Sequence, residues 1–290
     1  MYPAEFDYQA PATVAEAVSL LQQNEDAKVL AGGHSLLPML KLRLSQPSLL
    51  VDIGRIAELK GITEENGSLR LGAMTTQQVI QDSDLVKKVS PLLAETASHV
   101  GDPQVRNRGT IGGTLAHGDP AADQTAAFLA LGGTVTVLGP NGERTIAADD
   151  LFLDMMTTAL EPDEVLVSVS VPGQPARTGS AYEKFANAAS GYAIVGVAAV
   201  VTLDEHGACS GARVAITGAG SKATRALGVE SALVGRRLDD ATVAAAAEHA
   251  AEGLSLMSDL HASEEYRAHL ATVFTRRAVT RAAARAAAGS

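Results

Sequence analysis

Cysteine is almost absent from this sequence, since Cys209 is the only one among its 290 residues. A single thiol cannot form an intrachain disulfide, and it cannot supply the several thiolates that a structural zinc or an iron–sulfur centre needs. His34 and His117 lie in two glycine-rich loops but lack a third partner at a ligand spacing. We therefore predict no metal site on this chain. Redox chemistry would need an organic cofactor, or metals in partner chains.

Tryptophan is also absent, and aromatic residues make up only 3% of the sequence, so platforms for stacking nucleic-acid bases are few. The formal net charge of −10 repels phosphate backbones, and we expect no nucleic-acid binding. No apolar run approaches the ~18–20 residues that a membrane-spanning helix needs. The first residues show neither the basic start nor the apolar stretch of a signal peptide, and a cytoplasmic, non-membrane-spanning protein is expected.

The N-terminal region predicts a strand and a helix that lead into the first glycine-rich loop. Thr13 is placed to cap a helix, with Glu16 three residues later as the capping-box partner. Apolar residues then recur at helical spacing over residues 14–21. Residues 28–30 predict a short strand, which ends at Gly32-Gly33.

The remaining patterns predict a mixed chain. Alternating or continuous apolar runs predict strands at residues 49–53, 68–74, 134–138, 164–172, 182–185, 193–203 and 208–217. Helical patterns cover residues 79–97 (interrupted at Pro91), 121–131, and two alanine-rich stretches near the C-terminus. Residues 101–123 have the Gly, Asp, Pro and Asn content of a loop, and residues 164–172 the alternation of a half-buried strand.

A stretch rich in Gly, Pro, Ser and Thr at residues 172–180 is the best candidate for a domain boundary. We place one domain at residues 1–175 and a second at residues 176–290. The first mixes helices and strands, and the second begins with a small sheet and ends in helices. The fold class is therefore α+β.

The first glycine-rich loop, residues 31–36, reads AGGHSL. Adjacent glycines permit positive φ and let the backbone approach a ligand closely. Consecutive N–H groups in such a turn can form a concave anion site, to which the Ser35 hydroxyl adds a donor. The alternative is a tight turn between a strand and a helix, with no ligand.

The second loop, residues 109–114, reads GTIGGT. Thr110 and Thr114 can donate to phosphate oxygens, and Ile111 can pack on an apolar ring. Asp123 can accept a hydrogen bond from a ribose hydroxyl, as acidic residues do in other dinucleotide sites. A glycine-rich turn without a ligand is again the alternative.

Two such loops together suggest a dinucleotide site in which two backbone cradles hold the two phosphates from opposite sides. Neither loop has the G-x-G-x-x-G spacing of a Rossmann fingerprint, and neither is a P-loop. The sequence thus points to a dinucleotide held by a different architecture.

The paired motifs AGGHSLLPMLKLRL (31–44) and GTIGGTLAHGDPAAD (109–123) resemble those of the FAD-binding subunits of the molybdenum hydroxylases, the family of xanthine dehydrogenase and carbon monoxide dehydrogenase. The resemblance extends to further segments, which are FDYQAPATVAEAVSLL, LVDI, GAMTT, DPQVRNRGTIGG, YEKF and ITGAGSKATRA. The likeness is greatest to the medium subunits of the aerobic carbon monoxide dehydrogenase group. The resemblance implies a vanillyl-alcohol-oxidase-like (PCMH-type) FAD domain, followed by a small α+β domain of the carbon monoxide dehydrogenase flavoprotein C-terminal type.

The resemblance also implies which residues contact FAD. Both glycine loops would wrap the pyrophosphate, Asp123 would face the ribose, Leu166 the flavin, Lys184 the polar edge of its ring, and Tyr192 the isoalloxazine. A cation beside the flavin N1–C2=O edge would stabilise the reduced anion. Without the resemblance, Lys184 would be interpreted as a solvent-exposed charged residue on a strand, and Tyr192 as an aromatic residue of the core. The implied set is Val29, Leu30, Ala31, Gly32, Gly33, His34, Ser35, Leu36, Thr110, Ile111, Gly112, Gly113, Thr114, Asp123, Leu166, Lys184 and Tyr192.

Two departures from the family pattern bear on function. Thr114 stands where relatives usually have Asn, which keeps a hydroxyl donor but loses the amide, so we expect FAD binding to survive. The small residues ANAAS at 186–190 replace charged residues of some relatives, which bears on how the terminal electron acceptor enters.

By resemblance, this chain transfers electrons and carries no substrate chemistry or catalytic residue of its own. A large molybdopterin subunit would oxidise the substrate, and two [2Fe–2S] clusters on a small subunit would pass electrons to this FAD and on to quinone, NAD or O₂. A dimer of heterotrimers is expected, and carbon monoxide is the best guess for the substrate. Three alternatives stay open. The complex could hydroxylate xanthine, N-heterocycles or aromatic-CoA thioesters. The chain could instead be a free-standing flavin oxidase, or a scaffold that has lost its flavin.

Overall fold

The computed structural model describes residues 2–289, and its N-terminal segment builds a three-stranded parallel sheet. The strands are β1 (Asp7–Gln9), β2 (Lys28–Leu30) and β3 (Leu49–Asp52), in the order β1-β3-β2. Helix α1 (Val14–Gln23) connects β1 to β2, and the Thr13 side chain accepts from the Glu16 amide as predicted. The first glycine loop follows β2 and leads into α2 (Leu36–Lys41).

A five-stranded antiparallel sheet forms the centre of the N-terminal part. Its strands, in spatial order, are β4 (Ile62–Glu65), β5 (Ser68–Gly72), β10 (Val165–Pro172), β6 (Thr134–Gly139) and β7 (Gly142–Ala147). The prediction that β10 is half-buried is wrong. Residues 165–169 are all buried, because this strand lies in the middle of the sheet and is covered on both faces.

The helices of this part are shorter and more numerous than the sequence predicted. Residues 77–98 form three helices, because the chain turns at Ser83 and again at Ser90, each of which starts a new helix. The 101–123 segment also contains two helices, so its reading as loop is wrong. The bounds are α3 (Gln77–Asp82), α4 (Asp84–Val89), α5 (Pro91–Ser98), α6 (Pro103–Arg106), α7 (Ile111–His117), α8 (Asp123–Leu131), α9 (Ala148–Leu151) and a 3₁₀ turn, Ala57–Leu59.

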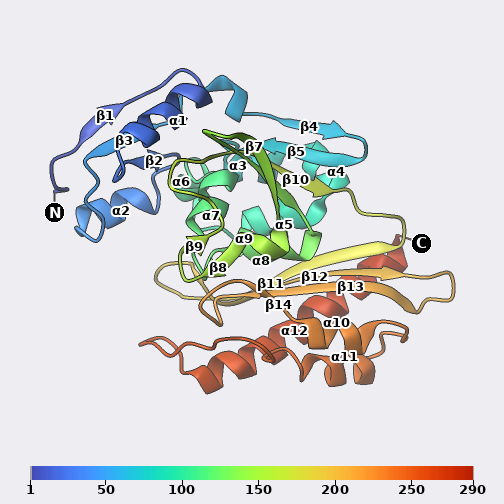
Figure 1. Ribbon diagram of the computed structural model, residues 1–290. Coiled ribbons are helices and arrows are strands. Elements are labelled where there is room, and N and C mark those ends of the chain that lie inside the picture. The colour runs from blue at the N-terminus through green and yellow to red at the C-terminus, as the bar shows by residue number, and fades with distance from the viewer. Residues whose placement is uncertain (1, 290) are drawn as a thin grey trace.

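The C-terminal part is an antiparallel sheet covered by helices, as predicted (Figure 1). Its strands are β11 (Thr178–Ala186), β12 (Ala193–Leu203), β13 (Cys209–Thr217) and β14 (Thr224–Arg225), in that spatial order. Its helices are α10 (Leu227–Leu233), α11 (Asp240–Ala247) and α12 (Glu264–Ala288). Cys209 is 1% exposed on β13, as expected of a small apolar residue.

Both faces of this C-terminal sheet are buried. Tyr182, Ala198 and Ala215 point into the core that also contains α8 and the five-stranded sheet. Alternate residues on the same strands, such as Val197 and Val214, pack under α10 and α12 instead. Figure 1 shows the sheet lying between α8 on one side and α12 on the other. The two parts of the chain therefore share one continuous core.

Ion pairs add to this junction. Glu95 on α5 pairs with Arg281 and Arg285 on α12. The change from one sheet to the next falls between β10 and β11, and a domain boundary after residue 175 stays a prediction. Among residues 2–289, no helix is long and apolar enough to cross a membrane.

Candidate functional site

The two glycine loops meet in space although they are far apart in the sequence. A Cβ added to Gly32 would lie 2.2 Å from the carbonyl oxygen of Arg108, and one added to Gly113 would lie 3.5 Å from the Cβ of Ala31. A methyl group at Gly32 would therefore push the loops apart. The close contact explains why position 32 needs glycine.

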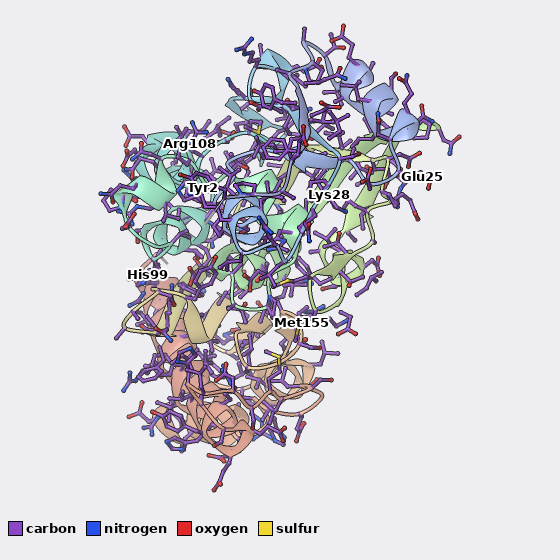
Figure 2. All side chains as sticks on the ribbon, turned by 90° about the vertical axis from the view of Figure 1, so that its left-hand side faces the viewer. Tyr2, Glu25, Lys28, His99, Arg108 and Met155 are labelled. Carbon is purple, nitrogen blue, oxygen red and sulfur yellow. The ribbon has the colours of Figure 1, made fainter. Side chains whose placement is uncertain are left out.

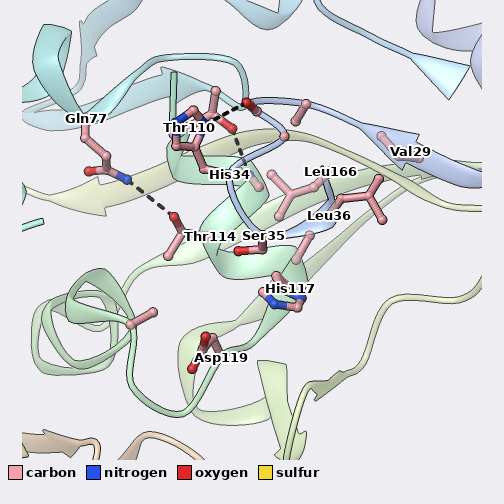
Figure 3. Close-up of a pocket in the computed structure, with 18 of the residues that line it drawn as sticks. Val29, His34, Ser35, Leu36, Gln77, Thr110, Thr114, His117, Asp119 and Leu166 are labelled. Carbon is pink, nitrogen blue, oxygen red and sulfur yellow. Dashed lines mark hydrogen bonds between the residues drawn. The ribbon is translucent and has the colours of Figure 1, made fainter. Parts of the chain in front are cut away.

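A cavity of ≈ 550 Å³ opens beside these loops (Figure 3), within the range of about 300–1,000 Å³ usual for small-molecule and cofactor sites. Most of the residues predicted to bind the cofactor line it. They are Val29, Ala31, Gly32, Gly33, His34, Ser35, Leu36, Thr110, Gly112, Gly113, Thr114, Asp123, Leu166 and Tyr192.

Three of the predicted residues do not line the cavity: Leu30, Ile111 and Lys184. The Leu30 side chain lies against Gly33 from behind. Ile111 is fully buried in the core, so it does not offer an apolar surface to a ring. Lys184 is no solvated strand charge either, because its side chain is only 3% exposed and its ammonium pairs with Asp123.

The first loop presents backbone N–H groups that have no protein partner. Gly33 has a φ of +77°, which glycine adopts without strain. Within residues 2–289, the amides of residues 32–35 donate to no acceptor, whereas the Gly33 carbonyl accepts from Leu37 and the Gly32 carbonyl contacts the His34 ring. Successive free amides of this kind form an anion-binding concavity.

The second loop contributes differently from the expected backbone cradle. The four amides of residues 111–114 donate to the carbonyls of Thr75, Ala73 and Thr110 and to the Thr110 hydroxyl oxygen. The expectation of two backbone cradles is therefore wrong, because Thr110 caps α7 and the first two residues of α7 donate to the segment before α3. What this loop offers to a ligand is close backbone approach at Gly112 and Gly113, and the hydroxyl of Thr114.

Asp123 closes the cavity next to the C-terminal part. The hydroxyl of Tyr182 donates to its Oδ1 at 2.6 Å, and Lys184 Nζ lies 2.8 Å from the same oxygen and 2.9 Å from Oδ2. Lys184 also donates to the backbone oxygen of His99, which Figure 2 places at the junction of the two parts. Burial raises the pKa of the Asp123 carboxyl, and the neighbouring Lys184 charge opposes that rise.

Tyr192 reaches the cavity from the turn between β11 and β12. Its side chain is hydrogen-bonded to Ser35 in the first loop, and burial together with the nearby Asp119 carboxylate raises the pKa of its hydroxyl. The residue is 43% exposed, so it is not the core aromatic that the sequence alone would suggest. It stands at the rim of the cavity and bridges the two parts of the chain.

Several lining residues had no predicted role. Gln77, His117, Asp119, Met156 and Glu164 all border the cavity. His117 and Asp119 lie within the second motif, residues 109–123, so their position in the sequence indicated that they lie near the site. Gln77 directly follows the GAMTT segment, but nothing in its local sequence shows that α3 lies behind α7.

The cavity suits FAD. Its lining combines the free amides of the first loop with apolar side chains such as Val29, Ile53, Met74 and Leu166. A diphosphate needs the former, and flat ring systems need the latter. The glycine positions, whose Cβ atoms would collide with Arg108 and Ala73, let the loops beside the cavity pack closely against neighbouring backbone.

Comparison with known proteins agrees with this reading. The model of the FAD-binding domain in molybdopterin dehydrogenase matches residues 4–174, and that of the carbon monoxide dehydrogenase flavoprotein C-terminal domain matches residues 180–282. The carbon monoxide dehydrogenase medium chain of Hydrogenophaga pseudoflava is 44% identical over 288 residues, which is 99% of this chain and 100% of that relative.

Two further relatives extend the comparison. A subunit of the 6-hydroxypseudooxynicotine dehydrogenase complex of Paenarthrobacter nicotinovorans is 40% identical and covers 99% of this chain and 97% of that relative. The solved structure of the Hydrogenophaga pseudoflava carbon monoxide dehydrogenase that lacks the Mo-pyranopterin moiety aligns with a TM-score of 0.95 at 45% identity, over 98% of this chain and 99% of that chain. The fold, the cavity and these matches together place the chain in the family of FAD-binding, medium subunits of molybdenum-containing dehydrogenases.

Proposed function

We propose that this chain is the FAD-carrying electron-transfer subunit of a molybdenum hydroxylase complex. The observation that carries the proposal is the contact between the two glycine loops beside one cavity, in a chain whose whole length matches the family. Bound FAD supplies the one- and two-electron redox chemistry, and the protein holds and tunes it.

The proposal gives roles to the following groups around the cavity. The free amides of residues 32–35 and the hydroxyls of Ser35 and Thr114 bind the diphosphate. Asp123 faces the ribose, and Leu166 and Tyr192 pack against the flavin. Lys184 does not line the cavity, but its ammonium group pairs with Asp123 and compensates the carboxylate charge. We assign no catalytic acid or base to this chain, because the proton that accompanies flavin reduction can come from solvent.

The proposed partners are a large molybdopterin subunit and a small subunit with two [2Fe–2S] clusters, in a dimer of heterotrimers. Within the described residues, no group of three or more His, Cys, Asp or Glu side chains could hold a metal ion. The terminal acceptor is quinone, NAD or O₂, and the cytoplasmic location stays a prediction from the sequence.

We propose carbon monoxide as the substrate of the complex. The carbon monoxide relative is 44% identical and the 6-hydroxypseudooxynicotine relative 40%. The higher identity favours carbon monoxide, and purines, N-heterocycles and aromatic-CoA thioesters are the alternatives. The large subunit, not this chain, would determine which of them is oxidised.

Purification of the native complex tests the proposal directly. The complex should show the visible absorbance of oxidised flavin, contain molybdenum and iron, and bleach when its substrate is added. Identification of the large partner would name the substrate class. A flavin-free complex would favour a scaffold, and a chain that oxidises a small alcohol without partners would favour a free-standing oxidase.

A further inference from the structure

Two buried glutamine side chains behind the second glycine loop form a hydrogen-bonded series that ends at Thr114. Gln124 on α8 donates from Nε2 to the Leu93 carbonyl at 3.2 Å and to Gln77 Oε1 at 3.0 Å. Gln77, the first residue of α3, donates from Nε2 to Thr114 Oγ1 at 3.5 Å (Figure 3), at the long end of the hydrogen-bond range. Both glutamines are 0% exposed, so water does not compete for these bonds.

The direction of hydrogen-bond donation along this series is set at its buried end, because the Leu93 carbonyl oxygen can only accept. Gln124 must turn its NH₂ group toward Leu93, and the same group then donates to Gln77. Gln77 therefore presents its oxygen to Gln124 and its NH₂ group to Thr114. The Thr114 oxygen is fixed as an acceptor, and its single hydroxyl hydrogen is left to be donated elsewhere.

A threonine inside a helix commonly donates this hydrogen to the carbonyl four residues earlier. For Thr114 that carbonyl belongs to Thr110, which already accepts from the Thr114 amide at 3.0 Å. Among residues 2–289, the Thr114 hydroxyl makes no bond to it. Thr114 is half-buried and lines the cavity, whereas Gln77 borders the cavity from behind it and has no exposed surface.

We propose that Gln77 is a positioning residue for the cofactor. With Gln124, it orients the Thr114 hydroxyl so that this group donates its hydrogen to an acceptor oxygen of the bound dinucleotide. The inference rests on the proposed FAD function. It also explains how Thr serves where resembling sequences usually carry Asn: the buried glutamines fix the direction, and the hydroxyl delivers the hydrogen.

The affinity of the full-length chain for FAD tests this inference. Flavin is removed from the chain, and FAD is titrated back while the quenching of flavin fluorescence gives the Kd. Thr114→Val should raise the Kd about tenfold to a hundredfold, as expected for a lost hydrogen bond to a charged group. Gln77→Met should raise it about tenfold, because the hydroxyl stays but loses its direction.

The double variant distinguishes positioning from general damage to the structure. If Gln77 acts through Thr114, then Gln77→Met should add little in the Thr114→Val background. Thr114→Ser keeps the hydroxyl and should bind FAD within about twofold of the unmodified chain. Gln78→Met makes the same chemical change one residue along α3, outside the cavity lining, and should leave the Kd unchanged.

Independent, multiplicative effects of the two single variants would overturn the inference, and so would unchanged FAD binding by Gln77→Met. If Gln77→Met does not fold, Gln124→Met interrupts the same series one bond earlier and should weaken FAD binding in the same way; unchanged binding would again overturn the inference. An unmodified chain that binds no FAD would instead remove the proposed function as well.

Discussion

The buried pair of Lys184 and Asp123 allows a quantitative prediction for the variant Lys184→Met. The two side chains are 3% and 6% exposed, and their charged atoms lie 2.8 Å apart. Methionine keeps the apolar stem but leaves Asp123 with the Tyr182 hydroxyl as its remaining side-chain donor. Removing one partner of a buried pair typically costs about 3–5 kcal/mol, and we expect the free energy of unfolding to fall by about that amount at neutral pH.

The same variant should show a characteristic pH dependence. Burial raises the pKa of Asp123 and Lys184 opposes the rise, so loss of Lys184 raises this pKa further. A carboxyl with a raised folded-state pKa stabilises the fold fully below its unfolded value of about 3.9 and loses that contribution as pH rises through the folded pKa. The stability gap between Lys184→Met and the unmodified chain should therefore widen from about pH 5 to about pH 8.

Urea unfolding of the full chain at both pH values measures the gap. The double variant Asp123→Asn with Lys184→Met removes both charges and should recover most of the loss, because no unpaired charge stays buried. A gap that is constant or narrows with rising pH would refute the reasoning. A loss below about 1 kcal/mol, the value of an exposed ion pair, would refute it equally.

Two further predictions concern the loop contact and the second donor to Asp123. Gly32→Ala should release most of the bound flavin from the purified chain, because the new methyl would collide with the Arg108 carbonyl; Gly211→Ala, where a Cβ meets no atom within 4 Å, is the matched control, and equal flavin content in both would contradict the prediction. Tyr182→Phe should lower the free energy of unfolding by about 1–3 kcal/mol, since it leaves a buried acceptor with one donor fewer; an unchanged thermal midpoint would count against this.

Features set by neighbouring residues could be predicted from the sequence. The cap at Thr13 depends on Glu16 three residues away, and β12 has the predicted bounds, Ala193–Leu203, because its apolar run is continuous and bordered by turn residues. The two glycine loops were recognised for the same reason. Their residues must be small wherever the backbone approaches another group closely, and that requirement is visible in the sequence.

Features set by distant contacts could not be predicted. Residues 101–123 have a loop-like composition, yet α7 forms there because Thr110 caps it and its first amides pair with Thr75 and Ala73. Strand β10 alternates in sequence like a half-buried strand, but its place at the centre of the sheet covers both faces. In both cases tertiary packing overrides the local pattern.

The same limit applies to the site. Gln77 and Gln124 lie 47 positions apart in the sequence, and Lys184 and Asp123 lie 61 positions apart. Composition and spacing carry no signal for such pairs. The family resemblance pointed to Lys184, but only the structure shows that its charge is directed at Asp123 and that its side chain does not line the cavity.

The C-terminal part is therefore needed for the electrostatics of the cavity as well as for its shape. A diphosphate brings negative charge into a cavity already bordered by Asp119, Asp123 and Glu164. An Asp123 carboxylate without its partner cation would repel that charge. Lys184, on strand β11 of the C-terminal sheet, cancels the Asp123 charge from behind. Because β11 also packs against α12 on its other face, the position of this cation depends on the packing of the C-terminal sheet and its helices.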